Sequence, residues 1–228
     1  MQAGRRRLGC FHVARGVALS VNDVFRIITI EREYGSGAAE IAKTLAIRLG
    51  WKLWDQLLTQ EIARLAHCNQ ADLQEREERR DPLYYRLFKS FALGSYEGSP
   101  GIPVETLDAD SIVAFSERVV LEAAAAGNCV IVGRGSQHYL QSRTDTLRFF
   151  LYASSGAKIR RLILEGNSET NAITLANTID SERAAFIKNY FHVEWPNRSL
   201  YHAMINTDLG EEMVIRAILS FFRPREAH

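Results

Sequence analysis

The sequence has little cysteine, with three residues in 228. Cys10, Cys68 and Cys129 are far apart, odd in number, and form neither a CxxC pair nor a Cys/His cluster. This argues against a disulfide framework and against a zinc site. The pattern is typical of a protein of the reducing cytosol, so we expect a cytoplasmic location and no metal bound by cysteine.

Long apolar runs and a strong net charge are also missing. No run approaches the roughly 20 apolar residues that a membrane helix needs, so we expect no membrane insertion. The 28 Lys and Arg residues nearly balance the 27 Asp and Glu residues, leaving a net charge of +1. So small a charge argues against nucleic acid as the main partner. The oligomeric state is left open, with a homodimer as one possibility.

The hydrophobic content, 46% of the residues, is enough for one well-packed domain, which we place at residues 24–228. Residues 1–23 carry four scattered arginines and no continuous apolar core for export. We expect a flexible N-terminal tail or an over-extended start, with a targeting peptide as the alternative.

Strand-like and helix-like segments alternate along this domain. Residues 26–30 are β-branched and almost continuously apolar, as in a parallel strand covered on both faces. Further strands are expected at 51–55, 128–133, 148–153 and 204–208, and helices at 40–49, 110–126, 157–164, 171–191 and 211–222. This alternation predicts a three-layer α/β fold, with flanking helices around a parallel sheet. Helices at 59–80 and 83–93 and a loop at 94–103 predict a helical insert at about 70–110.

The first predicted strand leads into Gly35-Ser36-Gly37, and a helix follows. Such a turn directs several backbone N–H groups at one point, where the helix dipole adds positive potential, and so forms an anion site without side chains. The loop lacks the Gly-Lys-Ser/Thr ending of a phosphate-binding loop, because Ala38, Ala39 and Glu40 follow. The alternative is an ordinary tight turn between a strand and a helix.

A dinucleotide-binding turn is a second alternative, with Asp55 as the acidic residue about 20 positions further on. Two features oppose it. Glu40 stands where the third glycine of that motif should be, and residues 31–34 separate the strand from the first glycine.

Five segments resemble the cytidylate kinase-like proteins, relatives of cytidylate kinase among the nucleoside monophosphate kinases. They are ITIEREYGSGAAEIAKTLAIRLGWKLWD at 28–55, VIVGRGSQHYL at 130–140, LRFFLYASSGAKIRRL at 147–162, DSERAAFIKNYF at 180–191 and YHAMINTDLG at 201–210. The resemblance implies a nucleotide-binding transferase that moves the γ-phosphoryl group of ATP, with Mg²⁺, to a nucleoside monophosphate such as CMP or dCMP. It also implies a three-layer fold of the P-loop NTPase type, a lid at about 160–195 and small-molecule nucleotides as partners.

The resemblance assigns candidate roles to particular residues. The donor's phosphates would lie on the backbone N–H groups of Tyr34, Gly35, Ser36, Gly37, Ala38 and Ala39. Arg32 corresponds to the family's arginine at the start of the loop, and a pair with Glu33 or another carboxylate is its alternative role. The Ser-Gly-x-x-Tyr-Arg segment by which cytidylate kinase holds its acceptor is absent after Asp55.

Three further candidates lie later in the motifs. Asp55 would hold magnesium through water or orient the acceptor, or else would cap the following helix. Arg134, between two glycines, corresponds to the arginine that meets the acceptor phosphate, with a structural ion pair as the alternative. Arg183 belongs to the family's Asp-x-x-Arg segment and would close on the transferring phosphate, or would pair locally with Asp180. A non-catalytic nucleotide sensor, or a kinase for another small acceptor, remains as a rival function.

Overall fold

The computed structural model describes residues 25–55, 57–58, 60–61 and 109–222. The predicted tail at 1–23 lies outside these residues, as do the predicted helix at 83–93, the loop at 94–103 and nearly all of the insert at about 70–110. The division into a tail, a domain and an insert therefore stays a prediction.

Five parallel strands form one sheet in the order β2-β3-β1-β4-β5. The central strand, β1, runs over Ile27–Arg32 and is buried at all six positions, as its nearly continuous apolar sequence predicts. The other strands are β2 at Lys52–Trp54, β3 at Cys129–Val132, β4 at Thr146–Tyr152 and β5 at Ala203–Asn206.

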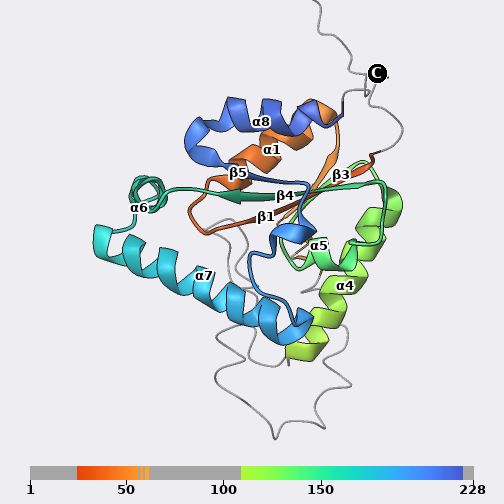
Figure 1. Ribbon diagram of the computed structural model, residues 1–228, viewed down its shortest axis with the longest axis horizontal. Coiled ribbons are helices and arrows are strands. Elements are labelled where there is room, and N and C mark those ends of the chain that lie inside the picture. The colour runs from red at the N-terminus through yellow and green to blue at the C-terminus, as the bar shows by residue number, and fades with distance from the viewer. Residues whose placement is uncertain (1–24, 56, 59, 62–108, 223–228) are drawn as a thin grey trace, which may run out of the picture.

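Helices cover both faces of this sheet (Figure 1). Their bounds are α1 Ala38–Leu49, α4 Ala109–Ala126, α5 Ser136–Tyr139, α6 Ser155–Leu164, α7 Glu169–Phe191 and α8 Glu211–Ser220. Two short 3₁₀ helices, at Arg198–Leu200 and Thr207–Leu209, flank β5. None of the helices among the described residues has the length and apolar character needed to cross a bilayer.

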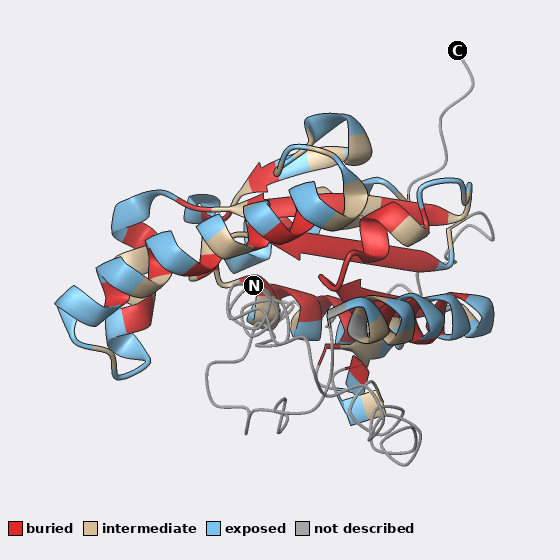
Figure 2. Ribbon diagram, turned by 90° about the horizontal axis from the view of Figure 1, so that it is seen from below, coloured by how far each residue is buried: buried red, intermediate tan, exposed pale blue. Residues whose placement is uncertain are grey.

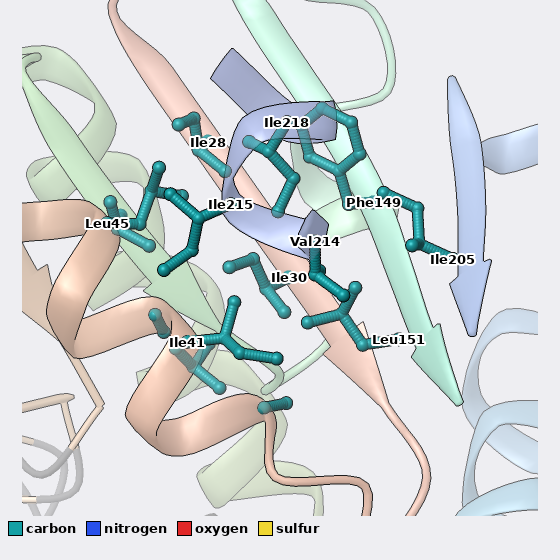
Figure 3. Close-up of a cluster of buried hydrophobic side chains, with 14 of the residues drawn as sticks. Ile28, Ile30, Ile41, Leu45, Phe149, Leu151, Ile205, Val214, Ile215 and Ile218 are labelled. Atoms are coloured by element: carbon teal, nitrogen blue, oxygen red, sulfur yellow. The ribbon is translucent and has the colours of Figure 1, made fainter. Parts of the chain in front are cut away.

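The larger apolar core lies between the sheet and helices α1 and α8 (Figure 3). Ile28 and Ile30 of β1 meet Leu45 of α1 and Ile215 of α8 there, and all four are fully buried. Each such side chain contributes about 1.5–3 kcal/mol when it leaves water. Alternate residues of β1 face the other side of the sheet, where Ile27 packs in the core formed with α4.

Burial separates the layers clearly: the inner strands β1, β3 and β4 are largely buried, and the helices turn exposed faces outward (Figure 2). The predicted three-layer α/β fold with a parallel sheet is confirmed. Because all five strands are parallel, their carboxyl ends meet at one edge of the sheet. Ligands of open α/β sheets bind in the crevice at that edge.

Candidate active site

A glycine loop, residues 33–37, joins β1 to α1 at the carboxyl edge of the sheet. Gly35 and Gly37 have φ values of 73° and 75°, in the left-handed region that suits glycine. Gly37 is the N-cap of α1, and no side chain caps this end of the helix. The positive end of a 12-residue helix is therefore open toward the loop.

The loop has backbone donors to offer to an anion. Among the described residues, none accepts a hydrogen bond from the backbone N–H of Gly35, Gly37, Ala38 or Ala39. The Oγ of Ser36 is also buried without a hydrogen-bond partner in this part of the chain. Orphaned donors at an uncapped helix end fit a phosphate group. Two loop donors are already used, because Ser36 N donates to Glu33 O and Tyr34 N donates to Asp180 Oδ1.

Side chains from two other elements hold the loop in place. Arg161 of α6 donates to Gly35 O and to Thr207 O, at 3.3 and 3.2 Å. Thr207 donates its hydroxyl hydrogen to Ser36 O at 2.7 Å. These bonds engage the carbonyl groups of Gly35 and Ser36 and leave the N–H groups of Gly35 and Gly37 for a ligand.

The three arginines that the sequence singled out line one pocket. Arg32, Arg134 and Arg183 surround it together with Glu31, Ile187 and Trp195. The cavity measures about 10 Å³ and so has room for about one water molecule. The indole Nε1 of Trp195 is buried and has no hydrogen-bond partner among the described residues. We call this site the arginine pocket.

Each arginine reaches the pocket from a different segment. Arg32 is the last residue of β1, and Arg183 lies on α7, where it donates to Arg32 O at 3.1 Å. Arg134 follows β3 with a φ of 59°, between two glycines that also have positive φ. A left-handed conformation costs a residue with a side chain about 1–2 kcal/mol. Such strain at a sheet edge is typical of functional sites.

The glycine before Arg134 is required by the packing of Arg32. A Cβ on Gly133 would overlap the guanidinium of Arg32, which passes directly over it. Gly133 therefore gives Arg32 the space to enter the pocket. Gly133 is thus needed so that the Arg32 side chain can pass over it, whereas Gly35 and Gly37 are needed for the left-handed backbone of the loop.

Positive charge is concentrated in the arginine pocket. Burial in the first place, and the nearby charge of Arg32 in the second, lower the pKa of Arg134 to about 9 and that of Arg183 to about 10. The guanidinium groups of Arg134 and Arg183 remain cationic at neutral pH. Glu31 is the carboxylate within the pocket; its Oε1 lies 3.5 Å from Arg32 Nη1, and Gln137 donates to its Oε2 at 2.9 Å. Of the two carboxylates beside it in sequence, Arg32 therefore pairs with Glu31, whereas Glu33 pairs with Lys158.

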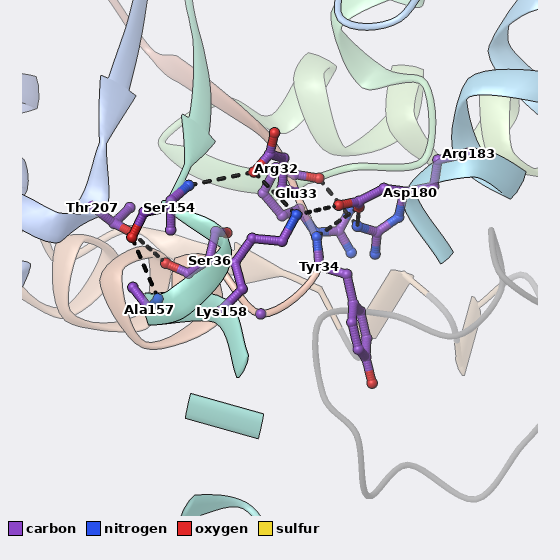
Figure 4. Close-up of polar contacts among 12 residues, drawn as sticks. Arg32, Glu33, Tyr34, Ser36, Ser154, Ala157, Lys158, Asp180, Arg183 and Thr207 are labelled. Carbon is purple, nitrogen blue, oxygen red and sulfur yellow. Dashed lines mark hydrogen bonds and ion pairs between the residues drawn. The ribbon is translucent and has the colours of Figure 1, made fainter. Parts of the chain in front are cut away.

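A cluster of charged side chains connects the pocket to the glycine loop (Figure 4). Asp180 of α7 accepts the Tyr34 N–H at 2.8 Å, lies 3.5 Å from Arg183, and binds Lys158 Nζ at 2.7 Å. Lys158 of α6 also donates to Glu33 Oε2 at 3.2 Å. The local pair expected between Asp180 and Arg183 is present. It coexists with the position of Arg183 in the pocket.

Asp55 lies just beyond β2, with 7% of its surface exposed. Its negative charge acts on Arg134 and opposes the lowering of that arginine's pKa. Glu40, at the position of the lost hydroxyl, is exposed and lies 3.6 Å from Lys43. Within the described residues, no group of three or more His, Cys, Asp or Glu side chains could hold a metal ion. A magnesium ion here would depend on phosphate oxygens and water as ligands, with Asp55 as the one predicted carboxylate at the edge.

Sequence reasoning missed several members of the site. Lys158, Glu31, Gln137 and Trp195 were not predicted. Glu31 carried a signal, because it is a carboxylate that directly follows the mostly apolar run of residues 27–30. Lys158 and Trp195 carried none, since their positions depend on how α6 and the segment after α7 fold against the loop.

The site can now be compared with known proteins. The sequence profile of the cytidylate kinase-like family matches residues 27–209 of the 228. The chain belongs to the cytidylate kinase-like family. The match spans β1 through the 3₁₀ helix after β5, and so includes the glycine loop and all three arginines. Membership in this family supports a phosphotransferase function. Among curated proteins, none matches the chain.

Solved structures also match the chain at low sequence identity. A crystal structure of an uncharacterized protein from Eubacterium ventriosum matches with a TM-score of 0.62 and 19% identity, covering 88% of this chain and 99% of that one. A shikimate kinase from Bacteroides thetaiotaomicron matches with a TM-score of 0.49 and 17% identity, covering 86% of this chain and 97% of that one. At 19% identity, the likeness to the Eubacterium ventriosum protein concerns the fold alone.

Proposed function

We propose that this cytidylate kinase-like protein transfers the γ-phosphoryl group of ATP to the phosphate of a nucleoside monophosphate, with CMP or dCMP as the acceptor. One observation carries the proposal: Arg32, Arg134 and Arg183 line a single pocket beside the glycine loop. A protein that only sensed nucleotide would need the loop and not a second, buried cluster of guanidinium groups. Family membership supports the choice of a cytidine nucleotide.

The donor is proposed to bind on the glycine loop. Its phosphates accept from the N–H groups of Gly35, Gly37, Ala38 and Ala39, and the dipole of α1 favours their negative charge. When bound, magnesium neutralises part of the phosphate charge, and we assign Asp55 to hold it through water or to orient the acceptor. The chain's own contribution is to position the phosphates, which is most of what catalysis of phosphoryl transfer requires.

The acceptor phosphate is proposed to enter the arginine pocket. Guanidinium groups suit phosphate oxygens because they present fixed pairs of donors. The present cavity accommodates about one oxygen atom, so a whole phosphate requires the pocket to widen. Movement of α7, which carries Arg183 and corresponds to the predicted lid, would provide that space.

The transfer step follows from this arrangement. An oxygen of the acceptor phosphate forms a bond to the γ-phosphorus, and the bond from that phosphorus to the β–γ bridging oxygen breaks. The electron pair of the broken bond stays on the β-phosphate of the departing ADP, and any proton on the attacking phosphate is released to water. Arg32, Arg134 and Arg183 stabilise the charge that is shared between the attacking and transferring groups.

A screen of acceptors tests the proposal. Purified protein is incubated with ATP, magnesium and each nucleoside monophosphate in turn, and ADP is measured together with the nucleoside diphosphate. We expect product with CMP or dCMP, and its loss in Arg134→Ala. If the protein binds ATP but forms no diphosphate from any acceptor, it is a nucleotide sensor and the proposal is wrong.

A further inference from the structure

The glycine loop has lost its own lysine, but a lysine from another element lies against it. Lys158 belongs to α6, more than 100 residues away in sequence, and its Cβ would lie 3.3 Å from a Cβ built on Gly35. The side chain of Lys158 is only 11% exposed. Burial of an ammonium group is costly, so favourable contacts must stabilise Lys158 where it packs on the glycine loop.

The contacts of Lys158 outline an anion site. Its Nζ donates to Asp180 Oδ2 at 2.7 Å, and the other oxygen of the same carboxylate accepts the Tyr34 N–H at 2.8 Å (Figure 4). One negatively charged group thus bridges the ammonium of Lys158 and the first amide of the loop. A phosphate has the same charge sign and the same oxygen acceptors, so Asp180 occupies the place that a phosphate would take.

The ammonium group is also suited to this role by its charge state and its remaining donor. The carboxylates of Asp180 and Glu33 raise the pKa of Lys158 despite the opposing effect of its burial, so the group is cationic at neutral pH. An ammonium has three N–H donors. In the described part of the chain, only Asp180 and Glu33 accept from Lys158, so one donor is left for a ligand.

The neighbouring cation on α6 has a different task. Arg161 donates to two backbone carbonyls, Gly35 O and Thr207 O, and so holds the loop in place. Its partners are neutral carbonyl groups, whereas those of Lys158 are carboxylates. Lys43, on α1, is 56% exposed and lies 3.6 Å from the exposed Glu40. Two cations of the described residues share the Asp180 carboxylate with the loop amide of Tyr34: Lys158, and Arg183 at 3.5 Å. Arg183 lines the arginine pocket, whereas Lys158 packs on Gly35 of the loop.

We propose that Lys158 supplies, from α6, the ammonium group that the glycine loop lacks, and that it binds the β- and γ-phosphates of the donor nucleotide. The inference rests on the proposed function, since it assigns a further residue to the same donor site. The incoming triphosphate replaces the carboxylate of Asp180 between Tyr34 N–H and Lys158 Nζ. Because α6 and not the loop carries the cation, the donor site is complete only while α6 packs on Gly35.

Calorimetric titration tests this assignment with two probes, the magnesium complex of the non-hydrolysable triphosphate AMPPNP, and AMP. We expect Lys158→Ala to weaken AMPPNP binding by about tenfold to a hundredfold, the usual range for a lost charged hydrogen bond. AMP, which has no β- or γ-phosphate, should bind within about threefold of its wild-type affinity on the same reasoning. Lys158→Arg should retain most of the AMPPNP affinity, because it keeps the charge.

Two variants serve as controls. Lys43→Ala removes an exposed lysine from the first turns of α1, and AMPPNP should bind to it as to the wild type. Lys158→Gln keeps a donor for Glu33 and Asp180 without the charge; it decides the question if Lys158→Ala does not fold, and thermal unfolding followed by circular dichroism checks both.

The outcomes separate the two proposals. Equal weakening of AMP and AMPPNP, or no weakening of either, would mean that Lys158 only stabilises the packing of α6, and the inference would be wrong. Wild-type protein that does not bind AMPPNP would overturn both the inference and the donor site of the proposed function. Wild-type protein that binds AMPPNP through Lys158 but transfers no phosphoryl group would overturn the proposed function alone.

Discussion

The glycine loop and the arginine pocket lie at the same edge of the sheet, but they offer hydrogen-bond donors of different kinds. The loop presents backbone N–H groups at the uncapped start of α1. The pocket presents guanidinium groups from β1, from the turn after β3 and from α7. A phosphate fits either set of donors, yet one depends on backbone conformation and the other on side-chain charge.

The two sets of donors respond differently to substitution. Backbone donors remain when side chains change, so the loop keeps its donors with Ala38 and Ala39 in place of a lysine and its neighbour. Side-chain donors are lost with a single substitution. The loop should therefore be sensitive to changes at glycine and the pocket to changes at arginine.

The largest expected effect is on transfer when the pocket loses Arg134. Arg134→Ala should lower kcat/KM for the acceptor by about a hundredfold to a thousandfold, as expected for loss of a donor to transition-state charge. The measurement is a steady-state assay at saturating ATP. Arg143→Ala is the matched control, because Arg143 pairs with Asp145 away from the pocket. A change of less than threefold in Arg134→Ala would show that the pocket has no part in transfer.

The next largest effect is expected when Gly133 is replaced, with Gly127 at the other end of β3 as the comparison. Gly127 and Gly133 flank β3, have φ values of 69° and 65°, and each faces an arginine side chain. Gly133→Ala would push the buried Arg32 out of the pocket, whereas Gly127→Ala would displace the exposed Arg26. Each should cost about 1–2 kcal/mol of unfolding free energy for the left-handed backbone.

Only Gly133→Ala should also weaken binding of the acceptor monophosphate, by about tenfold or more, since it removes a charged donor. Urea unfolding and calorimetry give the two quantities. Equal acceptor affinities in the two variants would contradict the role given to Arg32.

A smaller effect, on AMPPNP binding, is expected when a glycine of the loop is replaced. Gly37 and Gly50, at the two ends of α1, allow a matched comparison. Gly37 and Gly50 both have left-handed conformations, with φ of 75° and 65°, and an added Cβ at Gly50 meets nothing within 4 Å. Both Gly→Ala variants should lose about 1–2 kcal/mol of stability. Gly37→Ala alone should weaken AMPPNP binding, by several-fold to about tenfold, because the cradle of N–H groups is distorted. The same AMPPNP affinity in both variants would argue against the loop as the donor site.

The smallest expected effect is a dependence of the unfolding free energy on pH, which we attribute to His138 near Glu31 of the arginine pocket. Burial of His138, which stacks on Phe191 at 4.1 Å, lowers its pKa, and Glu31 opposes the shift only in part. The unfolded chain then binds a proton below about pH 6.5 that the folded protein does not bind, so the unfolding free energy falls as the pH falls through that value.

His138→Gln should show a smaller fall between pH 7.5 and pH 5.5 than the wild type in denaturant titrations. His192→Gln, which changes an exposed side chain, should follow the wild-type curve. If the two variants respond alike, buried His138 does not account for the acid sensitivity.

The sequence was sufficient to predict the sheet and most of its helices, because the periods of apolar residues reflect burial directly. The predicted helix 110–126 corresponds to α4 at Ala109–Ala126, and the predicted strand 148–153 to β4 at Thr146–Tyr152. The start of α1 was placed at residue 40 and lies at Ala38, since an N-cap glycine gives no polar capping signal.

The site was only partly predictable, for a physical reason. Arg32 and Arg134 follow strands, and strand ends of a parallel sheet meet at one edge, so their convergence is expected from the order of elements alone. Lys158 and Trp195 reach the site through the packing of α6 and of the segment after α7, which no local pattern specifies. Their roles, like those of Asp55 and the arginines, stay proposals until ligands are bound.

The central claim is that the glycine loop and the arginine pocket are two halves of one active site, and a bisubstrate compound tests it most directly. Adenosine and cytidine joined through five phosphates carry a donor chain and an acceptor phosphate in one molecule. Calorimetry should show that wild-type protein binds this compound at least tenfold more tightly than ATP or CMP alone, and that Arg134→Ala and Gly37→Ala each reduce the gain. A compound that binds no more tightly than ATP, with the same affinity in Arg134→Ala, would contradict the account.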